Sequence, residues 1–429
     1  MININKEKLG FWSIVLLGIN AIIGSGIFLL PNFGMKSFGP ASILVLFVDA
    51  FLACTIGMCF AECSGLFSET GGAYIYARQA FGNFFGYEVG IAAWVIRIIA
   101  EATMYMAFAT ALGGFFPALN SPFAHDVIVT IMGVFLMAIN IAGIRVSSVL
   151  NNVVTVGKLV PILLVIVVGL AFLHPANFHP FFITKLTTMH NFSNTAITLF
   201  YIFTGVEGLV VSAGEMNNVK KNLPRAILIV LGVVTLIYVL VMVACVGVMG
   251  TKLANTSVPL QSTMDTAIGH WGGAIIAIGS ILSIGGIGVA ATFITPRSMI
   301  ALSDHGIMPK SFAKRNRWNA PYVSIIVCTV LTLLLAYSGT FTKLAQISAV
   351  SRFAQYIPTC IAVMVFRKTM PKAKRAFKLP LGYTIPIIAL AVSAWLLVET
   401  NVEELLWGLG ALVIAVPFYF ITREYRHKI

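Results

Sequence analysis

Five ionisable side chains lie inside long apolar stretches of this chain: Arg97, Glu101, Lys158, Glu207 and Arg352. A charge inside a membrane is costly unless it faces a cavity or a partner, so these positions are the first candidates for a functional site. The alternatives are a structural ion pair, or a long side chain that reaches from a helix end toward water. Arg97 and Glu101 have i,i+4 spacing and could neutralise each other without any ligand.

Two of the apolar stretches are interrupted by glycines that flank a polar residue. They are residues 23–28, with the sequence IGSGIF, and residues 204–208, with the sequence TGVEG. Glycine leaves helical geometry easily, so both stretches are expected to unwind. Unwound backbone at membrane depth persists only where protein or a water-filled cavity satisfies it. One such helix could serve close packing alone, but two in corresponding positions predict the central site of a secondary transporter.

The composition indicates a membrane protein. Of the 429 residues, 59% are hydrophobic and only 10% are charged, well below the roughly 25% charged residues of soluble domains. The apolar runs are about 20 residues long, as in transmembrane helices, and lack the alternation of barrel strands. We therefore expect a single polytopic, all-α integral membrane domain over residues 1–429.

A window of about 19 residues yields candidate transmembrane spans along the whole chain. The twelve spans are residues 11–36, 40–66, 84–116, 125–144, 148–173, 192–216, 224–250, 271–303, 321–338, 343–366, 382–398 and 404–422. The two glycine-interrupted stretches lie in the first and the sixth of these spans.

The basic residues predict the orientation of the spans. With a cytoplasmic N-terminus, the inner segments hold 21 of the 28 lysines and arginines, and the outer segments hold only Lys36, Lys185, Lys252 and Lys343. Because positive charges accumulate on cytoplasmic loops, we expect a cytoplasmic-membrane protein with both termini cytoplasmic. The basic run 367–378 is interpreted as a segment that sets topology and contacts lipid headgroups, and no nucleic-acid partner is expected.

The sequence gives little support for disulfide bonds, metal sites or catalytic residues. The six cysteines all lie in apolar runs, so neither a disulfide framework nor a disulfide-linked partner is expected. The seven histidines lack metal-ligand spacing, and no phosphate-binding glycine loop or catalytic triad stands out. We expect no enzyme activity, no metal and no cofactor.

Several motifs follow one another in a specific order over nearly the whole chain. They are IIGSGIFLLP at 22–31, ETGGAYIYARQAFG at 69–82, NIAGIRVS at 140–147, FTGVEGLVVSAGEMNNVKKNLPRAI at 203–227 and PRSMIALSDHGIMPKSFAK at 296–314. With these motifs the chain resembles the amino acid-polyamine-organocation superfamily of permeases. The resemblance implies a LeuT-type fold with inverted five-helix repeats at 1–173 and 192–366, two peripheral helices at 382–422, and discontinuous helices 1 and 6. It also implies transport of amino acids or related amines by alternating access.

In such a fold the two breaks would bind the part common to all amino acids. Gly24 would be part of this site, and the carboxylate would accept hydrogen bonds from N–H groups around Ser25, Gly26 and Ile27. The ammonium would donate to carbonyl groups at Ala21, Ile22, Ile23, Phe203 and Thr204. By position along the helices, the substrate side chain would contact Glu101, Met104, Tyr201, Ile287, Ala291 and Ser351.

The resemblance implies roles for three further groups. Tyr201 would be an aromatic gate that stacks on the substrate, the alternative being an ordinary packing aromatic. Lys158 would bond the unwound first helix near Gly24 in place of the sodium ion of sodium-coupled relatives, and its charge state would bias outward-open against inward-open forms. Glu207 would either relay protons or hold the break open by bonding unwound backbone, and the structural role is favoured.

The substrate and the coupling mode stay open at this point. Glu101 would bind either a cationic substrate side chain or Arg97, so the sequence predicts no particular substrate charge. Transport is expected to be sodium-independent, as proton symport or as amino acid exchange. The alternatives are an antiporter that exchanges an amino acid for an amine and, in another class, a membrane sensor or channel on the same scaffold.

Overall fold

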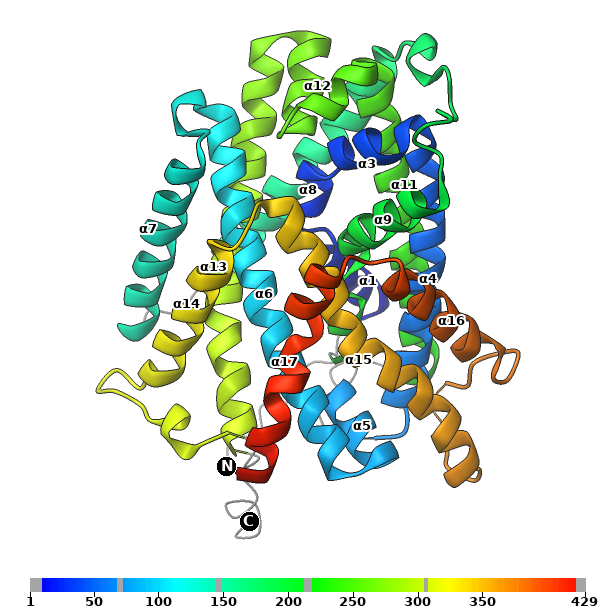
Figure 1. Ribbon diagram of the computed structural model, residues 1–429, viewed down its shortest axis with the longest axis vertical. Coiled ribbons are helices and arrows are strands. Elements are labelled where there is room, and N and C mark those ends of the chain that lie inside the picture. Colours follow the sequence, from blue (N-terminus) through cyan, green and yellow to red (C-terminus); the bar gives the residue numbers. More distant parts are fainter. Residues whose placement is uncertain are drawn as a thin grey trace.

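The computed structural model describes residues 10–67, 72–143, 148–211, 218–304, 308–375 and 377–421, and these ranges contain helices and no strand. Most of the long helices run side by side along the vertical axis of Figure 1, with α3 and α12 near the top and α5 near the bottom. The α-helices are α1 (Phe11–Ile22), α2 (Gly26–Leu29), α3 (Pro31–Phe38), α4 (Ser42–Ser64), α5 (Ala73–Phe81), α6 (Asn83–Phe115), α7 (Pro122–Ile141), α8 (Ser148–Ala171), α9 (Met189–Phe200), α10 (Val206–Val211), α11 (Val219–Met249), α12 (Pro259–Ile268), α13 (His270–Asp304), α14 (Tyr322–Ala336), α15 (Phe341–Thr369), α16 (Thr384–Val398) and α17 (Val402–Ile421).

Seven helical segments in the described ranges are long and apolar enough to cross a membrane. They are Pro31–Ser64, Asn83–Phe115, Pro122–Ile141, Lys221–Asn255, His270–Asp304, Phe341–Thr369 and Val402–Phe420. Shorter apolar helices are Phe11–Ile22, Gly157–Ala171, Tyr322–Ala336 and Thr384–Val398. Each predicted range thus contains helix, but the first and sixth ranges do not form continuous helices.

The boundaries differ from the prediction where short helices lie between the long ones. The first predicted range, 11–36, is divided among α1, α2 and α3, and the sequence prediction lacks α5 and α12. Gly82 connects α5 to α6, and its φ of 92° is a conformation that favours glycine and lets the chain turn directly into α6. Hydropathy alone missed these short helices because they are too short and too polar to register in a window of about 19 residues.

α6 is a central helix of the bundle. It packs against α5, α7, α13, α14, α15 and α17. In its most apolar stretch 67% of the residues are buried, against 17% for α7 and for the last helix. On α7 the large apolar side chains Phe123, Ile131 and Phe135 are exposed, a surface suited to lipid. The bundle therefore has an interior layer around α6 and a peripheral layer that includes α7 and α17.

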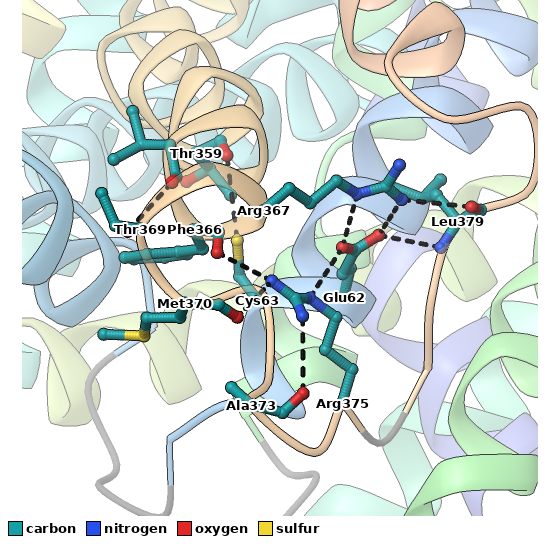
Figure 2. Close-up of polar contacts among 11 residues, drawn as sticks. Glu62, Cys63, Thr359, Phe366, Arg367, Thr369, Met370, Ala373, Arg375 and Leu379 are labelled. Carbon is teal, nitrogen blue, oxygen red and sulfur yellow. Dashed lines mark hydrogen bonds and ion pairs between the residues drawn. The ribbon is translucent and has the colours of Figure 1, made fainter.

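A buried charge cluster holds the segment between α15 and α16 (Figure 2). Glu62 on α4 is 1% exposed, and its carboxylate accepts hydrogen bonds from Arg367 Nε (2.8 Å), Arg367 Nη2 (2.5 Å) and the Leu379 N–H (2.8 Å). Arg375 Nε lies 3.3 Å from Glu62 Oε1, and Arg375 Nη2 donates to the Phe366 carbonyl near the end of α15. Two arginines of the basic run 367–378 are therefore buried structural partners, which corrects its interpretation as a lipid-headgroup segment at these positions.

Candidate functional site

The first helix breaks within the sequence IGSGIF, as expected. Its last helical hydrogen bond runs from the Ile23 N–H to the Ile19 carbonyl (3.0 Å). Ile23 itself is extended, with φ −69° and ψ 104°, and α2 begins at Gly26. The break removes the N–H partners that a continuous helix would supply to the carbonyl groups of the preceding turn. These carbonyl groups belong to Asn20, Ala21 and Ile22.

The second break lies between α9 and α10. After a short 3-10 turn at Tyr201–Phe203, Thr204 is extended with ψ 148°, and Gly205 has φ 113°. A Cβ atom on Gly205 would lie 2.6 Å from the Ala21 carbonyl oxygen. The backbone of the second break thus touches the backbone of the first, and only glycine fits at this contact.

Two adjoining cavities lie beside the breaks. The inner cavity has a volume of about 110 Å³ and is lined by Asn20, Ala21, Ile22, Ile23, Gly24, Gly26, Ala100, Met104, Tyr201, Ile202, Thr204, Gly205, Ile287 and Arg352. The outer cavity has a volume of about 410 Å³ and extends toward α5, with a lining that includes Ala73, Tyr74, Ile96, Arg97, Glu207, Ala291, Thr295 and Gln355. Ala21, Ala100, Gly205, Ile287 and Arg352 line both.

Most of the residues predicted to bind the substrate or to take part in coupling meet at these cavities. Those on the inner cavity are Ile22, Ile23, Gly24, Gly26, Met104, Tyr201, Thr204 and Ile287. Ala291 and Glu207 line the outer cavity. The remaining ones, which line neither, are Ser25, Ile27, Glu101, Lys158, Phe203 and Ser351.

Tyr201 links the two breaks through its side chain. Its hydroxyl lies 3.2 Å from the Ser25 hydroxyl oxygen, at hydrogen-bond distance. Its ring lies against Gly26, where an added Cβ would come within 2.9 Å of Tyr201 Cδ1, and makes an edge contact with Phe341. The ring is therefore a buried wall of the inner cavity, at a place where it could cover a ligand.

Glu101 does not pair with Arg97, which corrects the i,i+4 alternative of the sequence. The Tyr105 hydroxyl donates to Glu101 Oε1 (3.0 Å) and lies 2.7 Å from the Thr292 hydroxyl oxygen. The Asn140 side chain donates to the Thr292 carbonyl (2.9 Å). Glu101 thus belongs to a buried network joining α6, α7 and α13, whereas Arg97 faces the outer cavity.

The side chains of two further predicted residues lie outside the cavities. The Phe203 ring is fully buried and packs edge-on against Tyr238, with 5.3 Å between ring centroids, whereas the prediction for Phe203 concerns its carbonyl group, which the position of the ring does not test. The Ser351 hydroxyl donates to the Ser348 carbonyl (2.9 Å) within α15. The structure brings the neighbouring Arg352 to the site instead, because it lines both cavities.

Glu207 lies in a compact polar cluster beside the second break. Its Oε2 accepts hydrogen bonds from the Gly205 N–H (3.1 Å) and the Tyr356 hydroxyl (2.9 Å), and its Oε1 pairs with Arg352 Nη1. The expected bond between Glu207 and unwound backbone is therefore present. Tyr356 was not predicted from the sequence, although its i,i+4 spacing from Arg352 puts both residues on one face of α15.

Lys158 is 2% exposed and bonds the first helix one turn before the break. Its ammonium donates to the Asn20 carbonyl and to Asn20 Oδ1, both at 2.8 Å. This corrects the expected contact near Gly24. The reason is local, since the Asn20 carbonyl is the first one that the break deprives of a helical partner.

Tyr238 on α11 is a site residue that the sequence analysis missed. Its hydroxyl lies within donating distance of two carbonyl oxygens, those of Ile202 (2.9 Å) and Ile22 (3.3 Å). It therefore joins the backbones of both breaks. No periodicity singles out this tyrosine within an apolar helix, so only the fold reveals the contact.

Helices broken beside one shared cavity are typical of secondary transporters, whose substrates bind at such breaks. The comparison with known families agrees. The model of the amino acid permease family matches residues 9–420, so the chain belongs to this family. This confirms the resemblance to the amino acid-polyamine-organocation superfamily.

Curated relatives from Bacillus subtilis cover nearly the whole chain. A branched-chain amino acid permease is 29% identical over 99% of this chain and 94% of its own length. A serine/threonine exchanger is 30% identical over 97% of this chain and 96% of its own. A methylthioribose transporter is 26% identical over 95% and 92%, respectively. The chain is accordingly a multi-pass membrane transporter for small molecules and not an enzyme.

Proposed function

We propose that the chain carries amino acids across the cytoplasmic membrane by alternating access. The observation that carries this proposal is the direct contact between the two helix breaks at Gly205 and Ala21, beside a cavity lined by unwound backbone. The proposed architecture is the LeuT-type fold, with twelve spans, repeats at 1–173 and 192–366, and peripheral helices at 382–422. Both termini lie on the cytoplasmic side.

Backbone groups bind the amino and carboxylate groups of the substrate in this proposal. Ser25, Gly26 and Ile27 stand at the start of a helical turn, where N–H groups have no helical partner and suit a carboxylate. Ala21 lines both cavities, and its carbonyl accepts no hydrogen bond from the described residues, so this carbonyl suits the ammonium. Recognition through backbone tolerates many side chains, in keeping with the different substrates named for the relatives.

Lys158 takes the place of a coupling cation. Its buried ammonium bonds both oxygens of Asn20 and so ties α8 to the last turn of α1. A fixed positive charge at this position would make transport independent of sodium, with coupling by protons or by exchange. The relationship to a serine/threonine exchanger supports exchange. Glu207 holds the second break through its three partners.

From the helix breaks, the two cavities extend toward the α5 end of the bundle. The outer cavity reaches Ala73 and Tyr74 of α5, while Tyr201 and Ile202 stand at the inner cavity beside the breaks. α5 lies at the opposite end of the bundle from α3 and α12 (Figure 1). With cytoplasmic termini, this geometry corresponds to an inward-facing state of the alternating-access cycle.

The proposal is tested first by binding and then by flux. Purified protein is screened by thermal shift against the common amino acids and amines, because a ligand of the folded state raises its apparent stability. Uptake of the stabilising ligand into proteoliposomes is then measured with sodium or choline outside, with or without a pH gradient, and with or without amino acid or amine inside. Ligand-induced stabilisation with sodium-independent uptake supports the proposal. Strict sodium dependence contradicts the role of Lys158, and ion currents far above coupled flux would indicate a channel.

A further inference from the structure

Arg97 differs from Glu207 and Arg352, the other charged residues that line the cavity, because no described residue pairs with it. Arg97 is an exposed residue of α6 that lines the outer cavity, although α6 is apolar and long enough to span the membrane. Within the described part of the chain its guanidinium makes no hydrogen bond and no ion pair. An unpaired guanidinium inside a membrane-spanning helix is a candidate ligand-binding group.

The charges on the described cavity wall do not balance. The charged lining residues are Arg97, Glu207 and Arg352. The carboxylate of Glu207 is already engaged by Arg352, by the Tyr356 hydroxyl and by the Gly205 N–H. Glu207 and Arg352 pair with each other, and neither forms an ion pair or a hydrogen bond with Arg97. The described wall therefore carries one uncompensated positive charge, and it is located on Arg97.

The surroundings of Arg97 favour binding of an anion. Ile96, Ala100, Ile287 and Ala291 line the cavity with it, and such an apolar wall strengthens charge interactions relative to open water. A guanidinium matches a carboxylate with two parallel hydrogen bonds. Like charges brought together are unfavourable, so the same group would repel a cationic side chain or a polyamine.

Arg97 lies at a different depth from the helix breaks. Along α6 it precedes Met104, which lines the inner cavity, by about 10 Å of helical rise. Ala100, which lines both cavities, lies between them. A substrate at the breaks would therefore meet Arg97 only before or after it occupies the inner cavity, on the α5 side.

We propose that Arg97 is a second binding site for the substrate carboxylate, placed between the helix breaks and the α5 end of the bundle. Its charge selects substrates that carry a carboxylate and no net positive charge. This inference rests on the proposed amino acid transport and narrows its substrates to neutral and acidic amino acids. It disfavours the alternative of exchange with an amine.

The experiment uses the full-length protein and a thermal-shift panel of leucine, threonine, glutamate, lysine and putrescine. The panel member that most stabilises the wild type is then used, radiolabelled, for uptake into cells and into inverted membrane vesicles. Arg97→Gln is expected to raise KM about tenfold from the side that α5 faces, because a charge-assisted pair is lost. KM from the other side stays unchanged. Arg97→Lys keeps the positive charge but cannot donate two parallel hydrogen bonds, so its KM should lie between those of the wild type and Arg97→Gln. In Arg97→Gln, lysine and putrescine should compete better with the labelled substrate for uptake.

Arg297→Gln on α13 is the matched control. The Arg297 guanidinium donates to the Phe293 carbonyl, lies over the Phe293 ring and does not line the cavity, so both KM values should match the wild type. Melting temperatures of all variants check folding. An unchanged KM in Arg97→Gln, an equal rise from both sides, or a wild type stabilised only by lysine or putrescine would overturn the role of Arg97. A wild type that neither binds nor carries any panel member would instead contradict the proposed amino acid transport.

Discussion

Replacing Glu62 by glutamine tests the buried cluster that holds the segment after α15. The change keeps the shape of the side chain but removes the charge that faces two guanidinium groups. Arg367 loses a bidentate partner at 2.8 and 2.5 Å, and Arg375 loses the carboxylate at 3.3 Å. Glu62→Gln therefore leaves two positive charges in a nearly dry environment.

The expected destabilisation follows from burial. The Glu62 side chain is 1% exposed and the two arginine side chains are each 8% exposed, so solvent screens the interaction little. Breaking a buried ion pair by removing one partner costs about 3–5 kcal/mol. A loss of this size corresponds to a fall in melting temperature of the order of 10 °C.

Thermal unfolding of the Glu62→Gln protein can be followed through the reactivity of its buried cysteines. Cys59, Cys63, Cys245, Cys328 and Cys360 are free and buried, so a thiol-reactive fluorophore reports unfolding on heating in detergent. Lys343→Gln is the control, because this change breaks an ion pair whose side chains are 31% and 63% exposed and should cost less than about 1 kcal/mol.

A double variant separates lost charge pairing from lost packing. Glu62→Gln combined with Arg367→Gln leaves one guanidinium without its carboxylate, that of Arg375, instead of two, and should therefore recover part of the loss. A Glu62→Gln protein that melts together with the wild type would refute the reasoning.

Three further variants test the helix breaks. Lys158→Met is expected to abolish net uptake because Asn20 loses its cationic partner, while wild-type uptake is the same in sodium and in choline; full activity of the variant would contradict this. Gly205→Ala is expected to lower the melting temperature and stop transport, since the new Cβ would lie 2.6 Å from the Ala21 carbonyl oxygen at a φ of 113°, and normal folding and flux would show that the breaks do not touch. Tyr238→Phe keeps the ring but removes the donor shared by both breaks, so uptake should fall severalfold with little change in expression, and an unchanged rate would argue against a role for the hydroxyl.

The helix breaks could be predicted from sequence because their cause is local. The two glycines that flank Ser25, and the two that flank residues 206–207, weaken the helix at these places regardless of the tertiary structure around them. The partners of the freed backbone could not be predicted in the same way. Tyr238 comes from another helix, α11, and its hydroxyl reaches two carbonyl groups that are far apart in the sequence.

The pairing of ionisable groups was predictable only in part. Glu101 has two neighbours at i,i±4 spacing, Arg97 and Tyr105, and spacing alone cannot choose between them. The structure selects Tyr105 because Thr292 of α13 lies on that side and completes a hydrogen-bonded network. This pairing is decided by tertiary contacts, and it leaves Arg97 on the cavity wall without a partner among the described residues.

The carbonyl groups freed by the first break show how the protein leaves room for a ligand. A helix that stops at Ile22 leaves three successive carbonyl groups without partners. Lys158 occupies the carbonyl of Asn20, and Tyr238 reaches the carbonyl of Ile22. Ala21, between them, keeps a carbonyl with no donor from the described residues, and it lines both cavities. The protein supplies hydrogen-bond donors to the carbonyl groups on either side of Ala21, so a substrate ammonium would supply the donor that the Ala21 carbonyl lacks. Substrate binding would then itself order the helix break on which alternating access depends.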